Sequence, residues 1–196
     1  MRPLVVTLMQ SLDGVIDSPG GGDHPRAGWS FQDVAFEEAA YELKGREQEE
    51  AAAMLLGAQS YREFAPVWPS MTDEFPQYNA MPKFVVSSSL QESDLTWGPA
   101  HLLRSLDDVA RLRAGEPVDG AEEMGEGTVI VHGSADLVAG LAAADLVDRY
   151  HLLTFPVVLG AGKRFLGGDV VASRLAVREQ QTYANGVTMG VYDVVR

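Results

Sequence analysis

Residues 128–141, TVIVHGSADLVAGL, run from a short apolar stretch through a glycine directly into a helical pattern. The first residues are mostly β-branched and apolar, which is typical of a central strand. Gly133 lets the backbone turn sharply, and the apolar residues after it recur at helical spacing. The segment therefore predicts a buried strand at 128–132 followed by a helix at 134–144, the repeating unit of an α/β domain.

The same turn is a candidate seat for the pyrophosphate of a dinucleotide. The first N–H groups of a helix have no partner within the helix and lie at the positive end of its dipole. The candidate contacts are Gly133, Ser134, Ala135, Asp136 and Leu137. An ordinary helix start explains the same residues, with Ser134 as the N-cap and Asp136 in the first turn. The segment lacks the G-x-G-x-x-G spacing, so it is not a Rossmann fingerprint.

Two further buried strands are expected to end in small or hydroxyl-bearing residues. Residues 51–57, AAAMLLG, end at Gly57, and residues 82–88, PKFVVSS, end in two serines. Amides and hydroxyls at such strand ends are suited to a phosphate or a ribose, although each serine alone is explained by turn formation. Three such ends in one small sheet favour a ligand there.

The rest of the chain alternates strands and helices early and is dominated by strands late. Residues 3–10 predict a buried first strand, and residues 173–195 predict two antiparallel strands that turn at Asn185-Gly186. Other helices are expected within 33–50, 60–68, 73–81 and 106–114, and other strands at 101–105 and within 146–160. The pattern predicts a single three-layer α/β domain over residues 1–196. Its central sheet is mixed and mostly parallel, flanked by helices, with a C-terminal antiparallel hairpin.

Composition narrows the class of protein. The 196 residues are 46% hydrophobic, enough for a sizeable core, and include no cysteine. Disulfides, thiolate metal sites and cysteine nucleophiles are excluded, and no metal is expected. The net charge of −13 disfavours a nucleic-acid partner, which needs a basic surface. No signal pattern and no apolar run of about 20 residues is present, so a cytoplasmic protein without a membrane partner is expected.

Several short motifs, taken in order, carry a resemblance to a known family. They are SLDGVI, GWSF, LLGAQSY, PKFVVSS, VHGSADLV, LVDRYHLLTFPVVLGAGKRF and the closing hairpin, and they run nearly end to end. This set resembles the dihydrofolate-reductase-like superfamily, and within it the stand-alone relatives of the riboflavin-biosynthesis reductase (RibD C-terminal-like) domain. The resemblance implies a mixed sheet that binds NADPH across its strand ends and passes hydride to a pyrimidine or pteridine-like heterocycle. The nearest implied activity is 5-amino-6-(5-phosphoribosylamino)uracil reduction.

The resemblance also implies site residues by position. Contacts to the adenosine-side phosphates are implied for Gly57, Ala58, Ser60, Tyr61, Ser87 and Ser88. Residues 133–137 would hold the pyrophosphate, and Met9 and Trp29 would lie by the nicotinamide. Substrate contacts are expected from Phe31, His132 and Lys163.

Three positions depart from the family pattern. Ala58 and Ser60 stand where the superfamily's helix usually opens G-R-x-T, so the arginine that helps bind the 2′-phosphate is missing and NADH is possible beside NADPH. EFAP stands in place of Asp-Asp-Pro. His132 replaces an acidic residue that helps read the pyrimidine, and it is alternatively a structural histidine.

Reduction of a C=N or C=O bond needs a proton as well as a hydride. The candidates are Asp13 and Asp33, with Glu37 as a further one. Asp33 lies near the acid of folate reductases but equally suits a helix N-cap, and Asp13 equally suits a turn. Water is the alternative proton source. The Gly/Pro-rich residues 18–29 are interpreted either as a flap that excludes water or as a surface linker.

Three functional hypotheses follow. The first is a nicotinamide-dependent reductase, the second a dihydrofolate-type reductase, and the third a non-catalytic dinucleotide-binding protein with the same fold. A small heterocyclic substrate and a homodimer are expected. The run YHLLTFPVVLG, residues 150–160, is apolar enough to cover a second copy, or else it is a central strand buried on both faces.

Overall fold

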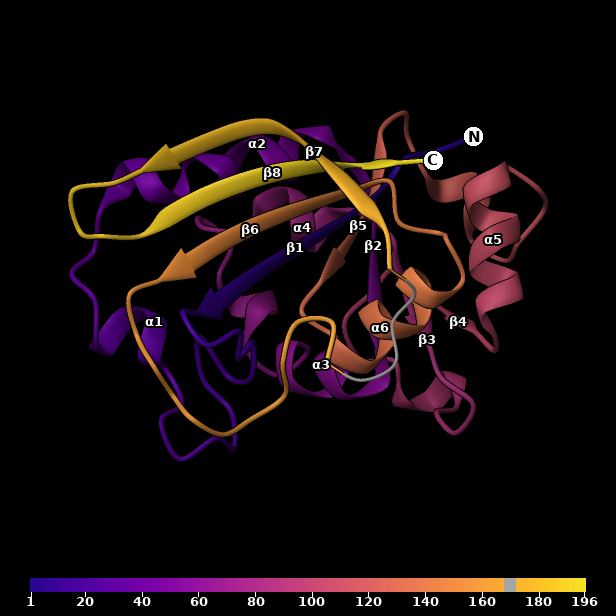
Figure 1. Cartoon of the computed structure of the whole chain (residues 1–196). Helices are drawn as coiled ribbons and strands as arrows, with labels where there is room; N and C mark the ends of the chain where they lie inside the picture. The colour runs from indigo at the N-terminus through magenta and orange to yellow at the C-terminus, as the bar shows by residue number, and fades with distance from the viewer. Residues whose placement is uncertain (168–171) are drawn as a thin grey trace.

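The computed structural model describes residues 1–167 and 172–196, and it is built on one sheet of eight strands. The strand order is β4-β3-β2-β5-β1-β6-β8-β7 (Figure 1). The strands are β1 Leu4–Ser11, β2 Ala51–Gly57, β3 Lys83–Val86, β4 Ala100–Leu103, β5 Thr128–His132, β6 Arg149–Phe155, β7 Arg174–Thr182 and β8 Thr188–Val195. Strands β1 to β6 pair in parallel, whereas β8 is antiparallel to both β6 and β7.

Helices cover both faces of the sheet. They are α1 Trp29–Gln32, α2 Glu42–Glu50, α3 Ala58–Phe64, α4 Pro76–Ala80, α5 Leu106–Ala114 and α6 Ala135–Ala143. Side chains of α5 and α6 pack on one face, and side chains of α1 to α4 pack on the other. The predicted three-layer fold, with its mostly parallel sheet and C-terminal hairpin, is confirmed.

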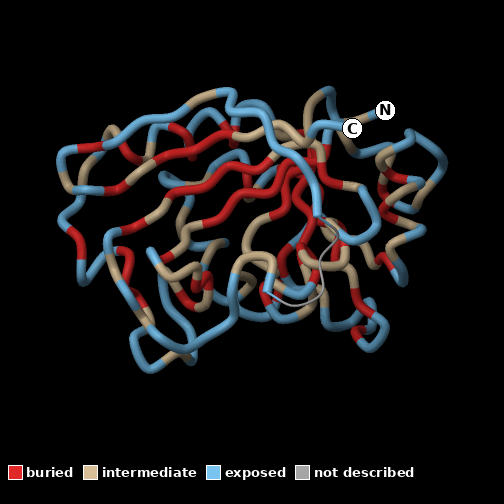
Figure 2. The backbone as a smooth tube through the Cα atoms, viewed as in Figure 1, coloured by how far each residue is buried: buried red, intermediate tan, exposed pale blue. Residues whose placement is uncertain are grey.

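The core follows the alternation of side chains along the strands. Leu4, Val6 and Leu8 of β1 belong to the cluster that α5 and α6 cover. On the other face the apolar packing is divided into two clusters, one around α1 and α2 and one around α3 and α4. Figure 2 shows the resulting pattern, with buried strands in the middle and exposed backbone around them. Central strands are thus buried on both faces, as expected for parallel strands.

The helix expected within 33–50 is shorter than predicted. A 3-10 turn over Glu38–Tyr41 leads into α2, and residues 33–37 form no helix. Phe36, which precedes the first helical turn, is 72% exposed and stacks on Tyr41 with ring centroids 5.2 Å apart. The expected helix was therefore too long at its start.

The first part of the run 150–160 is a central strand, β6, which ends at Phe155. Its strand part, within β6, lies between β1 and β8. Leu153 and Phe155 face the α2 side and Tyr150 faces the α6 side, all nearly inaccessible. The interpretation as a doubly buried strand is therefore confirmed for the part of the run within β6, whereas Val158 in the loop after it is 65% exposed.

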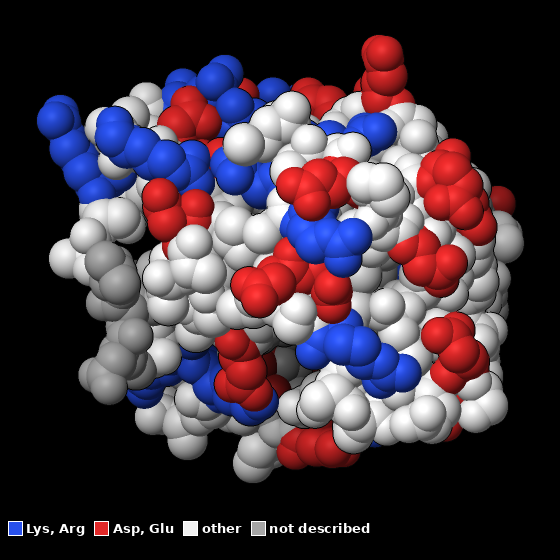
Figure 3. Space-filling view, turned by 90° about the vertical axis from the view of Figure 1, so that its right-hand side faces the viewer, with Lys and Arg blue, Asp and Glu red and all other residues white. Residues whose placement is uncertain are grey.

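The charged surface agrees with the acidic composition. On the face shown in Figure 3, many of the basic side chains gather at the upper left, while acidic side chains are spread over the centre and the right. Among the described residues, no helix is long and apolar enough to cross a bilayer.

Replacing Gly127 by alanine is expected to lower the free energy of unfolding by about 2–4 kcal/mol. Gly127 has a φ of 141°, and a Cβ there would press on the Glu50 carbonyl oxygen and lie 3.0 Å from the Ala52 amide nitrogen. Both obstacles are backbone atoms, so the junction between α2, β2 and β5 must shift.

Gly45→Ala is the matched control, because a Cβ at Gly45 meets nothing within 4 Å. Alanine in the interior of α2 is expected to raise the unfolding free energy by about 0.5–1 kcal/mol. Urea unfolding gives the free energy of unfolding of both variants and of the wild type. Equal losses in the two would show that close backbone approach at Gly127 does not matter.

Candidate functional site

The three strand ends picked out from the sequence lie side by side. β3, β2 and β5 are neighbours in the sheet, so their carboxyl ends share one edge. The Gly57 amide donates to Ser134 Oγ at 2.9 Å, and the Ser134 amide donates to Ser60 Oγ at 3.0 Å. These bonds join the starts of α3 and α6, and they bring the predicted cofactor residues around Gly57, Ser60 and Ser134 together.

The start of α6 leaves its first amides without a side-chain cap. Gly133 and Ser134 both adopt the left-handed conformation, with φ of 63° and 62°. Ser134 holds the N-cap position, but its hydroxyl accepts a hydrogen bond from the Gly57 amide at the end of β2 and none from an amide of α6. Ser134 is thus at the N-cap position, as the alternative of an ordinary helix start has it, but its side chain makes no capping hydrogen bond. The uncapped N–H groups at the positive end of α6 are suited to an anion.

The boundary between β1 and β5 is the switch point of the sheet. The two strands are parallel neighbours. The chain leaves β1 toward the face that carries α2 and leaves β5 toward the face that carries α6. In open α/β sheets this arrangement opens a crevice at the carboxyl ends, where ligands bind. Met9 lies on β1 and His132 at the end of β5, on either side of this boundary.

Lys163 lies at the same edge, although it was expected at the substrate. Its ammonium is 2.6 Å from the carboxylate of Asp136 and 3.3 Å from Gln59 Oε1. Asp136 is in the first turn of α6 and Gln59 in the first turn of α3. The loop before residue 167 thus brings a cation to the two helix starts, where Asp136 alone would repel a phosphate.

The remaining predicted cofactor residues differ in whether their side chains already make hydrogen bonds within the protein. The Ser87 hydroxyl accepts from the Leu90 amide at 3.0 Å and closes the turn after β3, whereas Ser88 is exposed. Tyr61 is buried, and its hydroxyl accepts from the Trp97 amide at 2.8 Å. Ala58 is partly exposed at the start of α3. Ser87 and Tyr61 thus support the backbone, while Ala58 and Ser88 line the edge.

Asp13 is an anchor for the loop after β6. Its carboxylate accepts from Ser11 Oγ at 2.6 Å and from the amides of Leu159 and Gly160 at 3.1 and 2.9 Å. These bonds, with the Ser11 hydroxyl first, hold the pKa of Asp13 well below its usual range. A carboxylate so fully occupied stays ionised, so its geometry does not support the expected role as proton donor.

Asp33 is also placed differently from the expectation. It follows α1 at the C-terminal end, not at an N-cap, and its carboxylate is 2.7 Å from the guanidinium of the exposed Arg26. Within the segment GWSF, Gly28 is the N-cap of α1 and the other three residues belong to the helix. An ion-paired acid at the surface does not match the buried acid of a folate reductase.

Trp29 and Phe31 are two residues apart, yet one side chain is buried and the other is exposed. Trp29 is fully buried, donates from Nε1 to the Asp17 carbonyl at 2.8 Å and meets Phe155 edge to face. Met9 packs against the same cluster. Phe31 is 54% exposed and stacks on Tyr41. Phe31 is therefore free for a ligand, while Trp29 supports the wall behind Met9.

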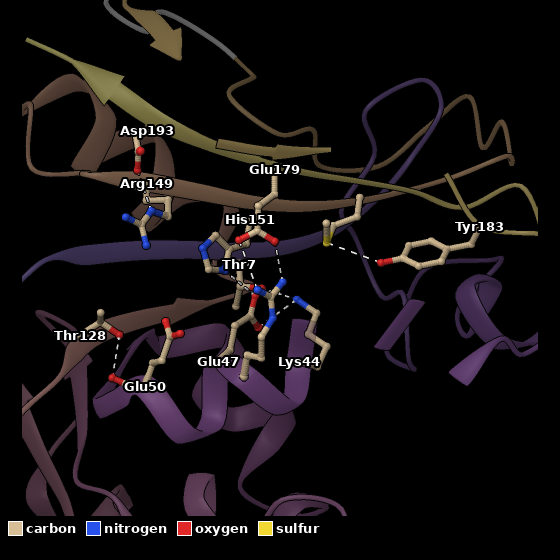
Figure 4. Close-up of polar contacts among 12 residues, drawn as sticks. Thr7, Lys44, Glu47, Glu50, Thr128, Arg149, His151, Glu179, Tyr183 and Asp193 are labelled. Carbon is tan, nitrogen blue, oxygen red and sulfur yellow. Dashed lines mark hydrogen bonds and ion pairs between the residues drawn. The ribbon is translucent and has the colours of Figure 1, made fainter. Parts of the chain in front are cut away.

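A buried polar cluster under α2 was missed by the sequence analysis. Glu47 accepts hydrogen bonds from Thr7 Oγ1 and His151 Nδ1, each at 2.8 Å, and lies 3.2 Å from the ammonium of Lys44 (Figure 4). Lys44 also donates to Thr7. The four side chains of the cluster come from three elements, β1, α2 and β6, and each of these residues is at least nine-tenths buried. The cluster separates the two apolar clusters on this face.

Glu47 is charged within this cluster. Burial alone would raise its pKa, but Lys44, then His151 and Thr7, outweigh burial and lower the pKa to about 2. The spacing of Leu43 and Glu47, four residues apart, was the available signal, since it places both on one helical face. Because Glu47 lies among other charged residues of the same helix, the sequence alone did not single it out.

His132 adjoins the cluster through the sheet, because Thr7 is its register partner. Phe64, Trp68 and Tyr78 surround its ring edge to face, at centroid distances of 5.6, 5.0 and 5.9 Å. Burial, reinforced by Lys44, lowers the pKa of His132 to about 3, so the ring is neutral at pH 7. It therefore brings a neutral hydrogen-bonding group, not a charge, to the switch point.

Glu47→Gln is expected to lower the free energy of unfolding by about 3–5 kcal/mol at pH 7, because the buried ammonium of Lys44 loses the charge that compensates it. The folded pKa lies below the ordinary 4.5, at about 2. The contribution of Glu47 is therefore complete above about pH 4.5 and is lost as the pH falls toward 2. Urea unfolding of both proteins from pH 7 to pH 3 should show their difference narrowing below pH 4.5.

The exposed Glu49 of the same helix provides the control. Glu49→Gln is expected to change stability by less than about 0.5 kcal/mol at every pH. A Glu47→Gln difference that is the same at pH 3 and pH 7 would contradict the charged state of the cluster.

Comparison with solved structures shows the same fold in proteins of low sequence identity. A riboflavin biosynthesis protein of Shewanella sp. PV-4 is 20% identical, with full coverage of both chains and a TM-score of 0.73. A pyrimidine reductase-like protein of Corynebacterium diphtheriae is 14% identical over all of this chain and 92% of that one, with a TM-score of 0.63.

A longer protein shares the fold over part of its length. It is the diaminohydroxyphosphoribosylaminopyrimidine deaminase/5-amino-6-(5-phosphoribosylamino)uracil reductase of Thermotoga maritima, which is 13% identical, with a TM-score of 0.65. The match covers 99% of this chain and 57% of that one. A search of curated proteins finds no match.

The family model agrees with the resemblance carried by the sequence motifs. It describes the RibD C-terminal domain and matches residues 2–189. Because that range is nearly the whole chain, the protein belongs to the RibD C-terminal domain family.

Proposed function

We propose that the protein is an NADPH-dependent reductase that transfers hydride to a pyrimidine or pteridine-like ring. The observation that carries the proposal is the gathering of the β3, β2 and β5 ends at one edge, beside the switch point between β5 and β1. In a member of the RibD C-terminal domain family, this edge is suited to a dinucleotide. The nearest activity is reduction of 5-amino-6-(5-phosphoribosylamino)uracil.

The cofactor is proposed to lie along the edge from β3 to β1. The uncapped amides of α6 after Gly133 hold the pyrophosphate, and Ser88 with Ala58 lies toward the adenosine side. Lys163 supplies the positive charge between the starts of α3 and α6. Met9 lies where the nicotinamide would reach the switch point, backed by the cluster that contains Trp29.

The substrate is proposed to lie at the switch point, between Phe31 and His132. NADPH supplies the hydride when bound. Asp13 is saturated by hydrogen bonds and Asp33 is ion-paired at the surface, so water is the proposed proton source. The neutral His132, bordered by the half-buried Trp68, offers hydrogen-bonding and stacking surface to a heterocycle.

A titration of the purified protein with NADPH and NADH, followed by tryptophan fluorescence, tests the proposal. Micromolar NADPH binding is expected, with weaker binding of NADH. Lys163→Ala is expected to weaken NADPH binding about fivefold, because a charged phosphate contact is lost. Asp136→Asn is expected to strengthen it, because the only acid in the first turn of α6 is removed.

The outcomes separate the hypotheses. NADPH binding together with oxidation of NADPH by a pyrimidine substrate supports the reductase, and binding without turnover supports a dinucleotide-binding protein. No binding of either cofactor overturns the proposal. An unchanged affinity in Lys163→Ala removes only the assigned role of Lys163.

A homodimer is part of the proposal. With β6 buried, the exposed edge strand β7 is the proposed surface, since Val177 is 62% exposed and Leu175 lies beside it on the same strand. Val177→Lys is expected to reduce the molar mass in solution to that of one chain, as measured by light scattering. A wild-type protein that is already monomeric would contradict the dimer.

A further inference from the structure

A polar pocket lies on the α2 side of the sheet, away from the carboxyl ends of the strands. It is formed between α2, the first residues of β6 and the hairpin of β7 and β8. Since β6 begins at Arg149, the pocket lies at the amino end of that strand. The proposed cofactor edge is at the opposite end, so the reductase proposal does not use this pocket.

His151 lines the pocket with one side of its ring. The imidazole is about 5% exposed, and its Nδ1 is held 2.8 Å from the carboxylate of Glu47. Its Nε2 is buried and has no hydrogen-bond partner among the described residues. Figure 4 shows the ring between Glu47 and Arg149. An unpartnered buried nitrogen is costly, so it points to a group that binds in the pocket.

Two arginines at the pocket also have unused donors. Arg149 and Arg178 each use Nε to hold one carboxylate, that of Asp193, at 2.7 and 2.9 Å. The described residues provide no acceptor for the terminal NH2 groups of either side chain. Two guanidinium groups fixed in this way by a shared acid have their outer nitrogens available for a second acceptor.

The acids around the pocket are nearly all engaged. Glu179 receives both terminal nitrogens of Arg46, at 3.2 and 2.9 Å, and Glu47 is occupied by the buried cluster. Glu50 is the one lining acid to which the structure gives no side-chain partner among the described residues. Glu50 is exposed, so water and salt screen its charge, whereas His151 and its Nε2 are buried.

We propose that this pocket binds a small oxyanion, bridged by His151 Nε2 and the outer nitrogens of Arg149 and Arg178. Three side chains from two strands, β6 and the edge strand β7, provide nitrogen donors that match the oxygens of a phosphate or a carboxylate. For His151 to donate from Nε2 while Nδ1 faces Glu47, both ring nitrogens must carry hydrogen in the complex. The anion would join β6 to the β7 edge beneath α2.

The full-length protein, labelled with 15N-histidine, provides the test. It is titrated with sodium phosphate and, separately, with sodium succinate, each against sodium chloride at matched ionic strength. A saturable change is expected in the ring nitrogens of His151, with Nε2 becoming an N–H nitrogen. The signals of His24, His101 and His132 are expected to stay in place, and His151→Gln assigns the His151 signal.

Arg149→Gln and Arg178→Gln are each expected to weaken the binding about tenfold, because a charge-assisted hydrogen bond is lost. Arg111→Gln is the control, since Arg111 lies on α5 and makes comparable surface ion pairs, 3.6 Å to Asp108 and 3.5 Å to Glu116. It should bind like the wild type. If Arg149→Gln fails to fold, the anion affinity of Arg178→Gln, on the exposed edge strand, decides whether the site exists.

Saturation by phosphate alone, by succinate alone or by both supports the site and identifies the kind of oxyanion. The absence of a saturable change with either anion would overturn it and leave a pocket filled by water. An anion affinity of Arg178→Gln equal to that of the wild type would also overturn the proposed site. The result is independent of NADPH binding, so failure of the reductase proposal would leave this test intact.

Discussion

The charged carboxylate of Glu47 is the interaction on which the arrangement of the α2 face depends. A buried charge is tolerated only when it is paired and hydrogen-bonded. Thr7 of β1, His151 of β6 and Lys44 of α2 itself meet that requirement together. A shift of α2 by one turn, or of β1 against β6 by one residue, would break at least one of these contacts. The cluster therefore fixes both the helix and the register of the two central strands.

That constraint also shapes the candidate site. With α2 held over β1, the chain leaves β1 on one face, while α6 follows β5 on the other, so the two strands form the switch point. His132 lies next to Thr7 across this boundary. The loop after β6 is held separately, because the carboxylate of Asp13 binds the amides of Leu159 and Gly160. The edge proposed for the cofactor thus carries the cationic side chain of Lys163 between the starts of α3 and α6.

The same polar cluster connects the two ends of the strands. Its His151 side opens on the pocket at the amino end of β6, and its Thr7 side adjoins the neutral His132 at the carboxyl end of β5. Asp13 and Asp33, the two acids that the sequence offered as proton donors, lie outside this cluster and are each held by other partners. The buried acid of this fold is one that lies in the charged tail of α2.

The sequence by itself determined the strand order in the chain, the tight turns and the family, because these depend on local patterns. Examples are the β-branched run before Gly133, the Asn185-Gly186 turn and the motifs now confirmed by the family model. Only the tertiary structure decided which polar residues are buried and with whom they pair. Glu47 and Asp33 are both acids near a helix, yet one meets donors from strands more than 35 residues away and the other meets a nearby surface arginine. Pairing across the sheet depends on register and helix placement, which no local spacing encodes.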